Sequence, residues 1–129
     1  MTRAILDTSV FIAREQGRAV GQPLPDEVAV SVVSVAELEL GVLIAQDAQK
    51  RAQRLRTLTE VRALAGALPI DERTASAYAQ LAACVLSEGR KPRIHDTWIA
   101  ATALVNDAEV WTRDSDFSEF AAAVSVVQV

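Results

Sequence analysis

The sequence predicts an α/β fold, a three-layer sandwich in which helices cover both faces of a mostly parallel sheet. Short apolar or β-branched runs, each long enough for one strand, alternate along the chain with longer segments of helical periodicity. Strands separated by helices pair in parallel, because each helical crossover returns the chain to the same end of the sheet. The alternation leaves the order of the strands open.

The first half of the chain alternates between predicted strands and helices. In order, the expected elements are a strand over residues 4–6, a helix from Ser9, a loop over 17–27, a strand over 28–33 and a helical region over 34–66. The loop contains two glycines and two prolines, and the second strand is β-branched. Asp7 or Thr8 is expected to cap the first helix, and Ser34 and Glu37 fit a capping box for the second.

The second half contributes three helices and two strands. The expected elements are a helix from Asp71 to Gly89, a helix over 96–108, a strand over 109–113, a short helix over 114–120 and a final strand over 123–129. Asp71 suits the N-cap of its helix, and Gly89 suits its C-terminal stop. The helix over 96–108 is rich in alanine and apolar on more than one side, so we expect most of it to be buried.

Length and composition are those of one globular domain, residues 1–129. Half of the residues are hydrophobic and 23% are charged, and no apolar run is long enough to span a membrane. The N-terminus lacks the features of a signal peptide and Cys84 is the only cysteine, so we expect a cytoplasmic protein without disulfides. Cys84 lies among alanines, which predicts a small packed thiol.

The charge is unevenly distributed along the chain. A net charge of −4 argues against a protein that binds nucleic acid through bulk positive charge. Positive charge is nevertheless concentrated in residues 50–56 and 89–93, whereas acids follow the apolar runs. The basic face over residues 50–62 is either a solvated surface or a contact for an RNA backbone.

Five acidic residues occupy similar places, after predicted strands or at the start of the buried helix: Asp7, Glu37, Asp96, Asp114 and Asp116. The carboxyl ends of parallel strands lie along one edge of a sheet, where open α/β folds bind their ligands. Each acid alone also has a structural explanation, because an acid at a helix start caps the helix or complements its dipole. As a group, however, they repel one another, and a divalent cation relieves this repulsion.

An all-carboxylate site suits Mg²⁺, or Mn²⁺ in its place, because both ions prefer hard oxygen ligands. His95 is the only histidine, which argues against zinc held by several imidazoles. A metal held by acids, without a cofactor-binding loop, points to hydrolysis of a phosphodiester or a phosphate ester. The hydroxyls of Thr8 and Ser9 are expected to hold Asp7 in place.

Four motifs resemble those of PIN domains in their order and spacing, and most closely those of the VapC-type ribonuclease toxins of toxin–antitoxin pairs: "LDTSVFI", "SVVSVAELELG", "HDTWIAATAL" and "VWTRDSDF". The resemblance covers essentially the whole chain. It implies a PIN-like fold and Mg²⁺-dependent endonucleolytic cleavage of RNA. It also implies a homodimer and a VapB-like antitoxin that inserts a peptide into the acidic groove.

The resemblance further implies a role for each candidate site residue. Those roles are direct metal ligation for Asp7 and Asp96, completion of the metal site for Asp114 and Asp116, a water-mediated contact for Glu37, and hydroxyl support from Ser9 and Thr112. Four of these residues match the catalytic quartet of the family: Asp7, Glu37, Asp96 and Asp114. Arg113, beside Asp114, is a candidate for contact with RNA, and His95 is expected at the surface.

Two other functions stay open. A phosphatase or phosphoryl-transfer domain would use Asp7 as its nucleophile, but Ser9 stands where this chemistry usually needs a second acid. That chemistry also needs a lysine near the phosphate, and Lys50 and Lys91 are the only lysines. A non-catalytic PIN-like module would use its acids only to cap helices or to bind a basic partner.

Overall fold

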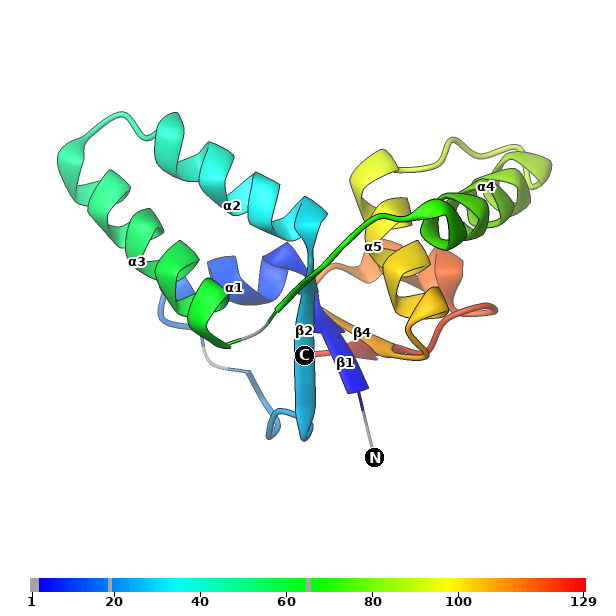
Figure 1. Cartoon of the computed structure of the whole chain (residues 1–129), viewed down its shortest axis with the longest axis horizontal. Helices are drawn as coiled ribbons and strands as arrows, with labels where there is room; N and C mark the ends of the chain where they lie inside the picture. Colours follow the sequence, from blue (N-terminus) through cyan, green and yellow to red (C-terminus); the bar gives the residue numbers. More distant parts are fainter. Residues whose placement is uncertain (1–2, 19, 65) are drawn as a thin grey trace.

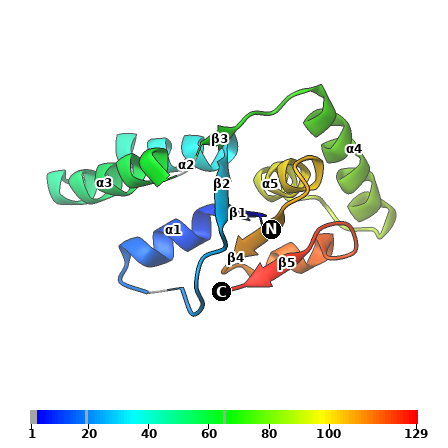
Figure 2. The ribbon, with the colours of Figure 1, turned by 60° about the horizontal axis from the view of Figure 1, so that its bottom comes forward.

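The computed structural model describes residues 3–18, 20–64 and 66–129, which form one sheet with helices on both faces (Figures 1 and 2). The sheet has five strands in the order β3-β2-β1-β4-β5, and every neighbouring pair is parallel. The strands are β1 (Arg3–Leu6), β2 (Glu27–Ser31), β3 (Ala67–Leu68), β4 (Glu109–Thr112) and β5 (Val126–Gln128). The expected three-layer α/β fold is confirmed.

Two helical layers cover the sheet. On one face lie α1 (Thr8–Glu15), α2 (Val32–Leu43) and α3 (Ala48–Leu64). On the other face lie α4 (Glu72–Ser87), α5 (Ile94–Val105) and the 3₁₀ helix η1 (Ser115–Phe120). In Figure 1, α2 and α3 form an arm on the left, and α4 and α5 form an arm on the right. Within the described ranges, no helix is long and apolar enough to cross a membrane.

The central strand β1 is buried on both faces, as expected for the middle of a parallel sheet. Ile5 packs into the core with α4 and α5, whereas Ala4 and Leu6 pack into the core with α1, α2 and α3. This alternation follows from the two-residue period of a strand. The next residue, Asp7, is therefore held at the carboxyl end of the most central strand.

The boundary between β2 and α2 differs from the prediction. The strand ends at Ser31, and Val32 and Val33 belong to the first turn of the helix. Ser31 caps α2, because its Oγ accepts a hydrogen bond from the Val33 backbone N–H (3.0 Å). The expected capping box of Ser34 and Glu37 is therefore wrong. Both residues lie inside the helix, and their side chains contact α1.

Other elements also differ from the prediction. The sequence does not predict β3, because a strand of two residues is too short to show a period. Helix α5 begins at Ile94 rather than at residue 96, with Arg93 at its N-cap. Strand β5 begins at Val126 rather than at residue 123, because the preceding residues form turns after η1.

Helix α4 has the ends that the sequence predicts. Asp71 is its N-cap and accepts a hydrogen bond from the Thr74 backbone N–H (2.9 Å), and Gly89 follows its C-cap at φ +76°. The prediction for Cys84 is wrong, because this residue is exposed. It falls outside the buried face of α4, which consists of Thr74, Ala77, Leu81 and Val85.

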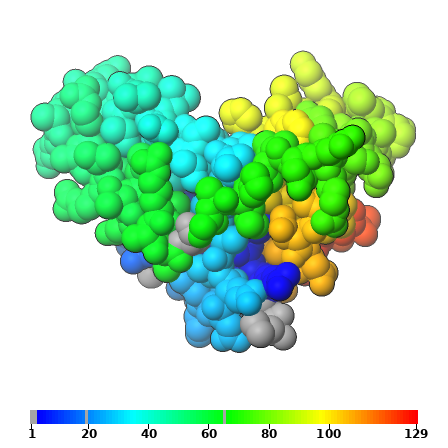
Figure 3. Space-filling view, in the orientation of Figure 1, coloured from blue at the N-terminus to red at the C-terminus, as the bar shows by residue number. Residues whose placement is uncertain are grey.

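The two arms leave an opening above the carboxyl ends of the central strands. Figure 3 shows this opening as a hollow at the top of the molecule, between α2 (cyan) and α5 (yellow). Strands β1 and β2 point toward it in Figure 1. The fold therefore directs the residues that follow these strands into the space between the arms.

Candidate active site at the carboxyl edge of the sheet

Four acidic residues converge where β1, β2 and β4 end. Asp7 directly follows β1, Asp114 follows β4, and Glu37 lies in the second turn of α2. Asp96 lies in the first turn of α5. The four are close enough to interact, because the negative charges of the other three all act on the Asp96 carboxyl. The structure thus brings together the four residues of the predicted quartet.

Asp7 both caps α1 and is held from the neighbouring strand. Its Oδ2 accepts hydrogen bonds from the Ser9 hydroxyl (2.6 Å), the Ser9 backbone N–H (3.4 Å) and the Thr112 hydroxyl (3.0 Å). The residue is 5% exposed. A cap needs only the backbone contact, so the two hydroxyl contacts do more than start the helix: they fix the direction of the carboxylate.

Ser9 and Thr112 also join the ends of β1 and β4. Their hydroxyl oxygens lie 3.3 Å apart. The Ser9 hydroxyl accepts a hydrogen bond from the Arg113 backbone N–H (3.0 Å), and the Thr112 hydroxyl accepts one from the Asp114 backbone N–H (2.9 Å). The two hydroxyls thus orient Asp7 and hold the backbone of the loop that carries Asp114.

The Asp96 carboxyl is a weaker acid than an ordinary aspartate. Burial raises the pKa of its carboxyl to about 6; Arg93 opposes this rise, and the three neighbouring carboxylates add to it. The Oδ2 atom of Asp96 is buried and accepts no hydrogen bond within the described part of the structure. A buried carboxylate oxygen without a hydrogen bond lowers the stability of the fold unless a cation compensates its charge.

Arg93, which the sequence analysis does not single out, places its guanidinium among the acids. Its Nε lies 3.1 Å from Asp96 Oδ2, its Nη2 lies 3.2 Å from Asp114 Oδ2, and its Nη1 pairs with Asp116. The contact with Asp96 lacks the alignment of a hydrogen bond, so it compensates charge only. A basic residue three positions before Asp96 is the signal that points to this contact, because residues i and i+3 are neighbours at a helix start.

Asp116 and Arg113 lie at the margin of the group. The Asp116 side chain is 61% exposed, against 30% for Asp114. The Asp116 backbone N–H donates to Asp114 Oδ1 (2.9 Å), so Asp114 also caps η1. Arg113 is partly buried, and its backbone N–H is the group that bonds to Ser9. Of the two acids in this loop, Asp114 is therefore the one nearer the interior.

Glu37 is held from two sides. The Thr8 hydroxyl donates to its Oε1 (2.8 Å), and His95 Nδ1 lies 3.5 Å from its Oε2. The expectation that Thr8 holds Asp7 is wrong, because the first turn of α1 directs this hydroxyl toward α2. There it also lies 2.9 Å from the Ser34 Oγ. The His95 side chain is 66% exposed, which agrees with the expected surface position.

A groove of about 360 Å³ opens beside the acids, between α1 and α2. Its lining includes residues around Glu37 and three apolar side chains that are more than a third exposed: Ile12, Leu40 and Ile44. A larger cavity of about 790 Å³ between α1 and α3 contains none of the predicted site residues. The smaller groove is therefore the one that joins the acidic group to exposed apolar surface.

The donor chemistry of the acids fits a hard divalent cation, but their arrangement here is not a preformed coordination sphere. Among the residues that the structure describes, no three acidic, histidine or cysteine side chains form a group that could hold a metal ion. The Arg93 guanidinium contacts Asp96 and Asp114 instead. The buried, unbonded Asp96 Oδ2 is the atom that best fits a metal ligand.

Comparison with known proteins identifies the family. The model of the PIN domain matches residues 4–123. The chain belongs to the PIN domain family. This PIN domain is also 45% identical to Ribonuclease VapC5 of Mycobacterium tuberculosis over 128 residues, which cover 97% of this chain and 94% of that protein.

Two solved structures extend the similarity to three dimensions. VapBC-5, a member of the VapBC family of toxin-antitoxin systems from Mycobacterium tuberculosis, matches this PIN domain with a TM-score of 0.86 and 41% identity over the whole of both chains. FitAcB from Neisseria gonorrhoeae matches with a TM-score of 0.72 and 34% identity over 95% of both chains. The resemblance to VapC-type toxins that the motifs indicate is confirmed.

Proposed function

We propose that this PIN domain is a Mg²⁺-dependent endoribonuclease and the toxin of a type II toxin–antitoxin pair. Asp96 is the observation that carries the proposal, because its buried Oδ2 has no hydrogen bond in the described structure while three other carboxylates act on it. Arg93 compensates this charge only in part and without a hydrogen bond, because the pKa of Asp96 stays raised, so the site favours a further cation. The similarity to a protein named Ribonuclease VapC5 supports RNA as the substrate.

The acids would share the metal between them. Asp7 and Asp96 would be direct ligands, Asp114 and Asp116 would complete the site, and Glu37 would act through a water. The bound metal supplies an activated water and stabilises negative charge on the scissile phosphate. Mn²⁺ is expected to replace Mg²⁺, since both ions bind carboxylate oxygens.

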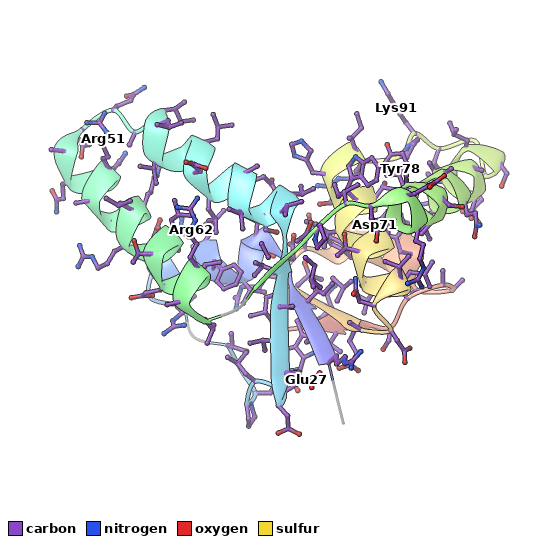
Figure 4. All side chains as sticks on the ribbon, viewed as in Figure 1. Glu27, Arg51, Arg62, Asp71, Tyr78 and Lys91 are labelled. Carbon is purple, nitrogen blue, oxygen red and sulfur yellow. The ribbon has the colours of Figure 1, made fainter. Side chains whose placement is uncertain are left out.

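The other side chains would orient the acids and bind RNA. Ser9 and Thr112 hold Asp7 in one direction. Arg113 is the nearest candidate for a contact with the RNA backbone. Figure 4 shows Arg51 and Lys91 on opposite arms, at the end of the molecule where the hollow opens. Positive side chains on both arms would attract a polyanion to the acids despite the net charge of −4.

A VapB-like antitoxin would bind across the acids and the adjoining groove. The contacts of Arg93 with Asp96 and Asp114 support this, because they show that these acids accept a guanidinium. VapBC-5, one of the matched structures, is named as a member of a family of toxin-antitoxin systems. Exposed apolar side chains outside the groove, such as Leu86 and Ile94, support a homodimer. We also propose that residues 1–129 form a single PIN domain that acts in the cytoplasm, where its RNA substrate is found.

The test is cleavage of an end-labelled RNA by the purified protein. We expect cleavage with Mg²⁺ or Mn²⁺, none in excess chelator, and full recovery when Mg²⁺ is restored. Asp96→Asn should lower the rate by about 100-fold or more, because it removes a carboxylate from the metal site. Asp47→Asn is the matched control. Asp47 accepts a hydrogen bond from the Lys50 backbone N–H (2.8 Å), and asparagine serves equally well there.

Three outcomes would contradict the proposal. Undiminished cleavage in excess chelator would exclude a metal-dependent reaction. Release of phosphate from a small phosphoester without RNA cleavage would favour the phosphatase. A protein that neither cleaves RNA nor binds Mg²⁺ or Mn²⁺ would be the non-catalytic binding module.

A further inference from the structure

Two adjacent hydroxyls at the start of α1 serve different acids. Ser9 bonds to Asp7, whereas Thr8 bonds to Glu37 on α2. Consecutive residues on a helix point about 100° apart, so one turn of α1 supplies a hydroxyl to each side of the site. The contact from Thr8 is the direct link between the end of β1 and the acid that follows β2.

The direction of the hydrogen bonds follows from the chemistry of the groups. Thr8 Oγ1 lies 2.8 Å from Glu37 Oε1 and 2.9 Å from Ser34 Oγ. The Thr8 hydroxyl is the donor in both contacts, and because it carries a single proton, Glu37 Oε1 and Ser34 Oγ share that proton as acceptors. Ser34, Thr8 and Glu37 thus form one hydrogen-bonded group, in which the Thr8 hydroxyl lies between the Ser34 hydroxyl and the Glu37 carboxylate.

The burial of the Thr8 and Ser34 hydroxyls argues that their hydrogen bonds do more than stabilise the fold. Thr8 is 6% exposed and Ser34 is fully buried, whereas the Glu37 side chain is 32% exposed. Water can therefore solvate the carboxylate without help from Thr8. Two buried hydroxyls between α1 and α2 would be replaceable by apolar groups of the same shape at little cost to stability. What apolar groups would not do is fix the direction of the Glu37 side chain.

We infer that Thr8, supported by Ser34, is a positioning residue that sets the orientation of Glu37 for metal binding. The inference rests on the proposed function, since it assigns Glu37 to the same metal site. Residues that hydrogen-bond to metal ligands from outside typically affect metal affinity or activity by 10- to 100-fold. Removal of the Thr8 hydroxyl should therefore lower metal affinity and activity, whereas removal of its methyl group should leave both unchanged.

The test compares variants that keep the shape of residue 8 and remove its hydroxyl. Thr8→Val should weaken Mn²⁺ binding by the metal-free protein, measured by calorimetry, on the order of 10-fold. It should lower kcat for RNA to a similar extent and leave KM nearly unchanged. Thr8→Ser, which retains the hydroxyl, should restore both values.

Two further variants separate orientation from folding. Thr8→Val with Ser34→Ala removes both hydroxyls, so it leaves no buried polar group unpaired, and its Tm should return toward the wild-type value while Mn²⁺ binding stays weak. Thr57→Val is the matched control, because Thr57 makes a similar hydrogen bond to Glu15 (2.7 Å) away from the acids. It should leave Mn²⁺ binding unchanged.

The outcomes distinguish this inference from the proposed function. If the wild type binds Mn²⁺ and cleaves RNA but the double variant matches it in both, the positioning role is wrong and the proposed function stands. The role is equally wrong if Thr8→Ser is as impaired as Thr8→Val. A wild type that neither binds Mn²⁺ nor cleaves RNA would overturn the proposed function, and this role with it.

Discussion

The guanidinium of Arg93 lies against the carboxylate of Asp96, with Nε 3.1 Å from Oδ2. The same guanidinium contacts Asp114 and Asp116. A cation that belongs to the chain therefore stands among the acids and compensates part of their mutual repulsion. Any metal that binds to these carboxylates has to compete with Arg93 for them.

Removal of this cation should strengthen metal binding. We expect Arg93→Ala to bind Mn²⁺ roughly tenfold more tightly than the wild type, since two or three partly exposed ion pairs together contribute about 1.4 kcal/mol. Calorimetric titration of the metal-free protein measures the difference. Arg90→Ala is the control, because Arg90 pairs with Glu88 and Glu119 rather than with the site. Equal or weaker binding by Arg93→Ala would contradict the competition.

The raised pKa of Asp96 predicts a pH-dependent gain in stability for Asp96→Asn. Burial raises the pKa of Asp96 to about 6 in the folded protein, from an ordinary value of 3.8. Between these values the folded state keeps a proton that the unfolded state has lost, so wild-type stability falls as the pH rises. Above about pH 6 the ionised carboxylate destabilises the fold by up to about 3 kcal/mol.

Asparagine stays neutral throughout this range. The unfolding free energy of Asp96→Asn should therefore exceed that of the wild type only slightly near pH 4. The difference should grow up to about pH 6 and then level off. Urea unfolding in chelator, at a series of pH values, measures it. A difference in unfolding free energy that does not change with pH would show that Asp96 titrates as an ordinary surface acid.

Thr112→Val should impair both the fold and the site. Thr112 is fully buried, and its hydroxyl donates to Asp7 and accepts from the Asp114 backbone N–H. Valine would leave that N–H unpaired, at a cost of about 1–3 kcal/mol in unfolding free energy, and would weaken Mn²⁺ binding on the order of 10-fold. Thr102→Val is the control, because among the described residues this buried hydroxyl bonds to the Trp98 carbonyl of its own helix and to no site residue. If both variants bind Mn²⁺ alike, Thr112 has no part in the site.

The sequence predicts the end of β1 correctly because local chemistry determines it. Ala4, Ile5 and Leu6 are apolar and Asp7 is a helix-capping acid, so the strand ends at Leu6. The start of α2 is different: Val32 and Val33 have strand propensity, but the Ser31 cap places them in the helix. Two residues of β3 carry no periodic signal at all.

Some features of the candidate site are also predictable from the sequence, and others are not. The grouping of Asp7, Glu37 and Asp114 follows from parallel topology alone, and Asp96 joins them because α5 begins at the same edge of the sheet. The role of Arg93 does not, because it depends on how one long side chain folds back over α5. Nor does the difference between Thr8 and Ser9, since adjacent hydroxyls in a sequence do not reveal which neighbour each one faces.

The central claim is that these carboxylates bind a divalent metal, and anomalous diffraction from crystals grown with Mn²⁺ tests it most directly. We predict an anomalous peak coordinated by Asp7 and Asp96, with the Arg93 guanidinium displaced from Asp96. At a saturating Mn²⁺ concentration, absence of a peak among the acids, with Arg93 still in contact with Asp96, would contradict the account.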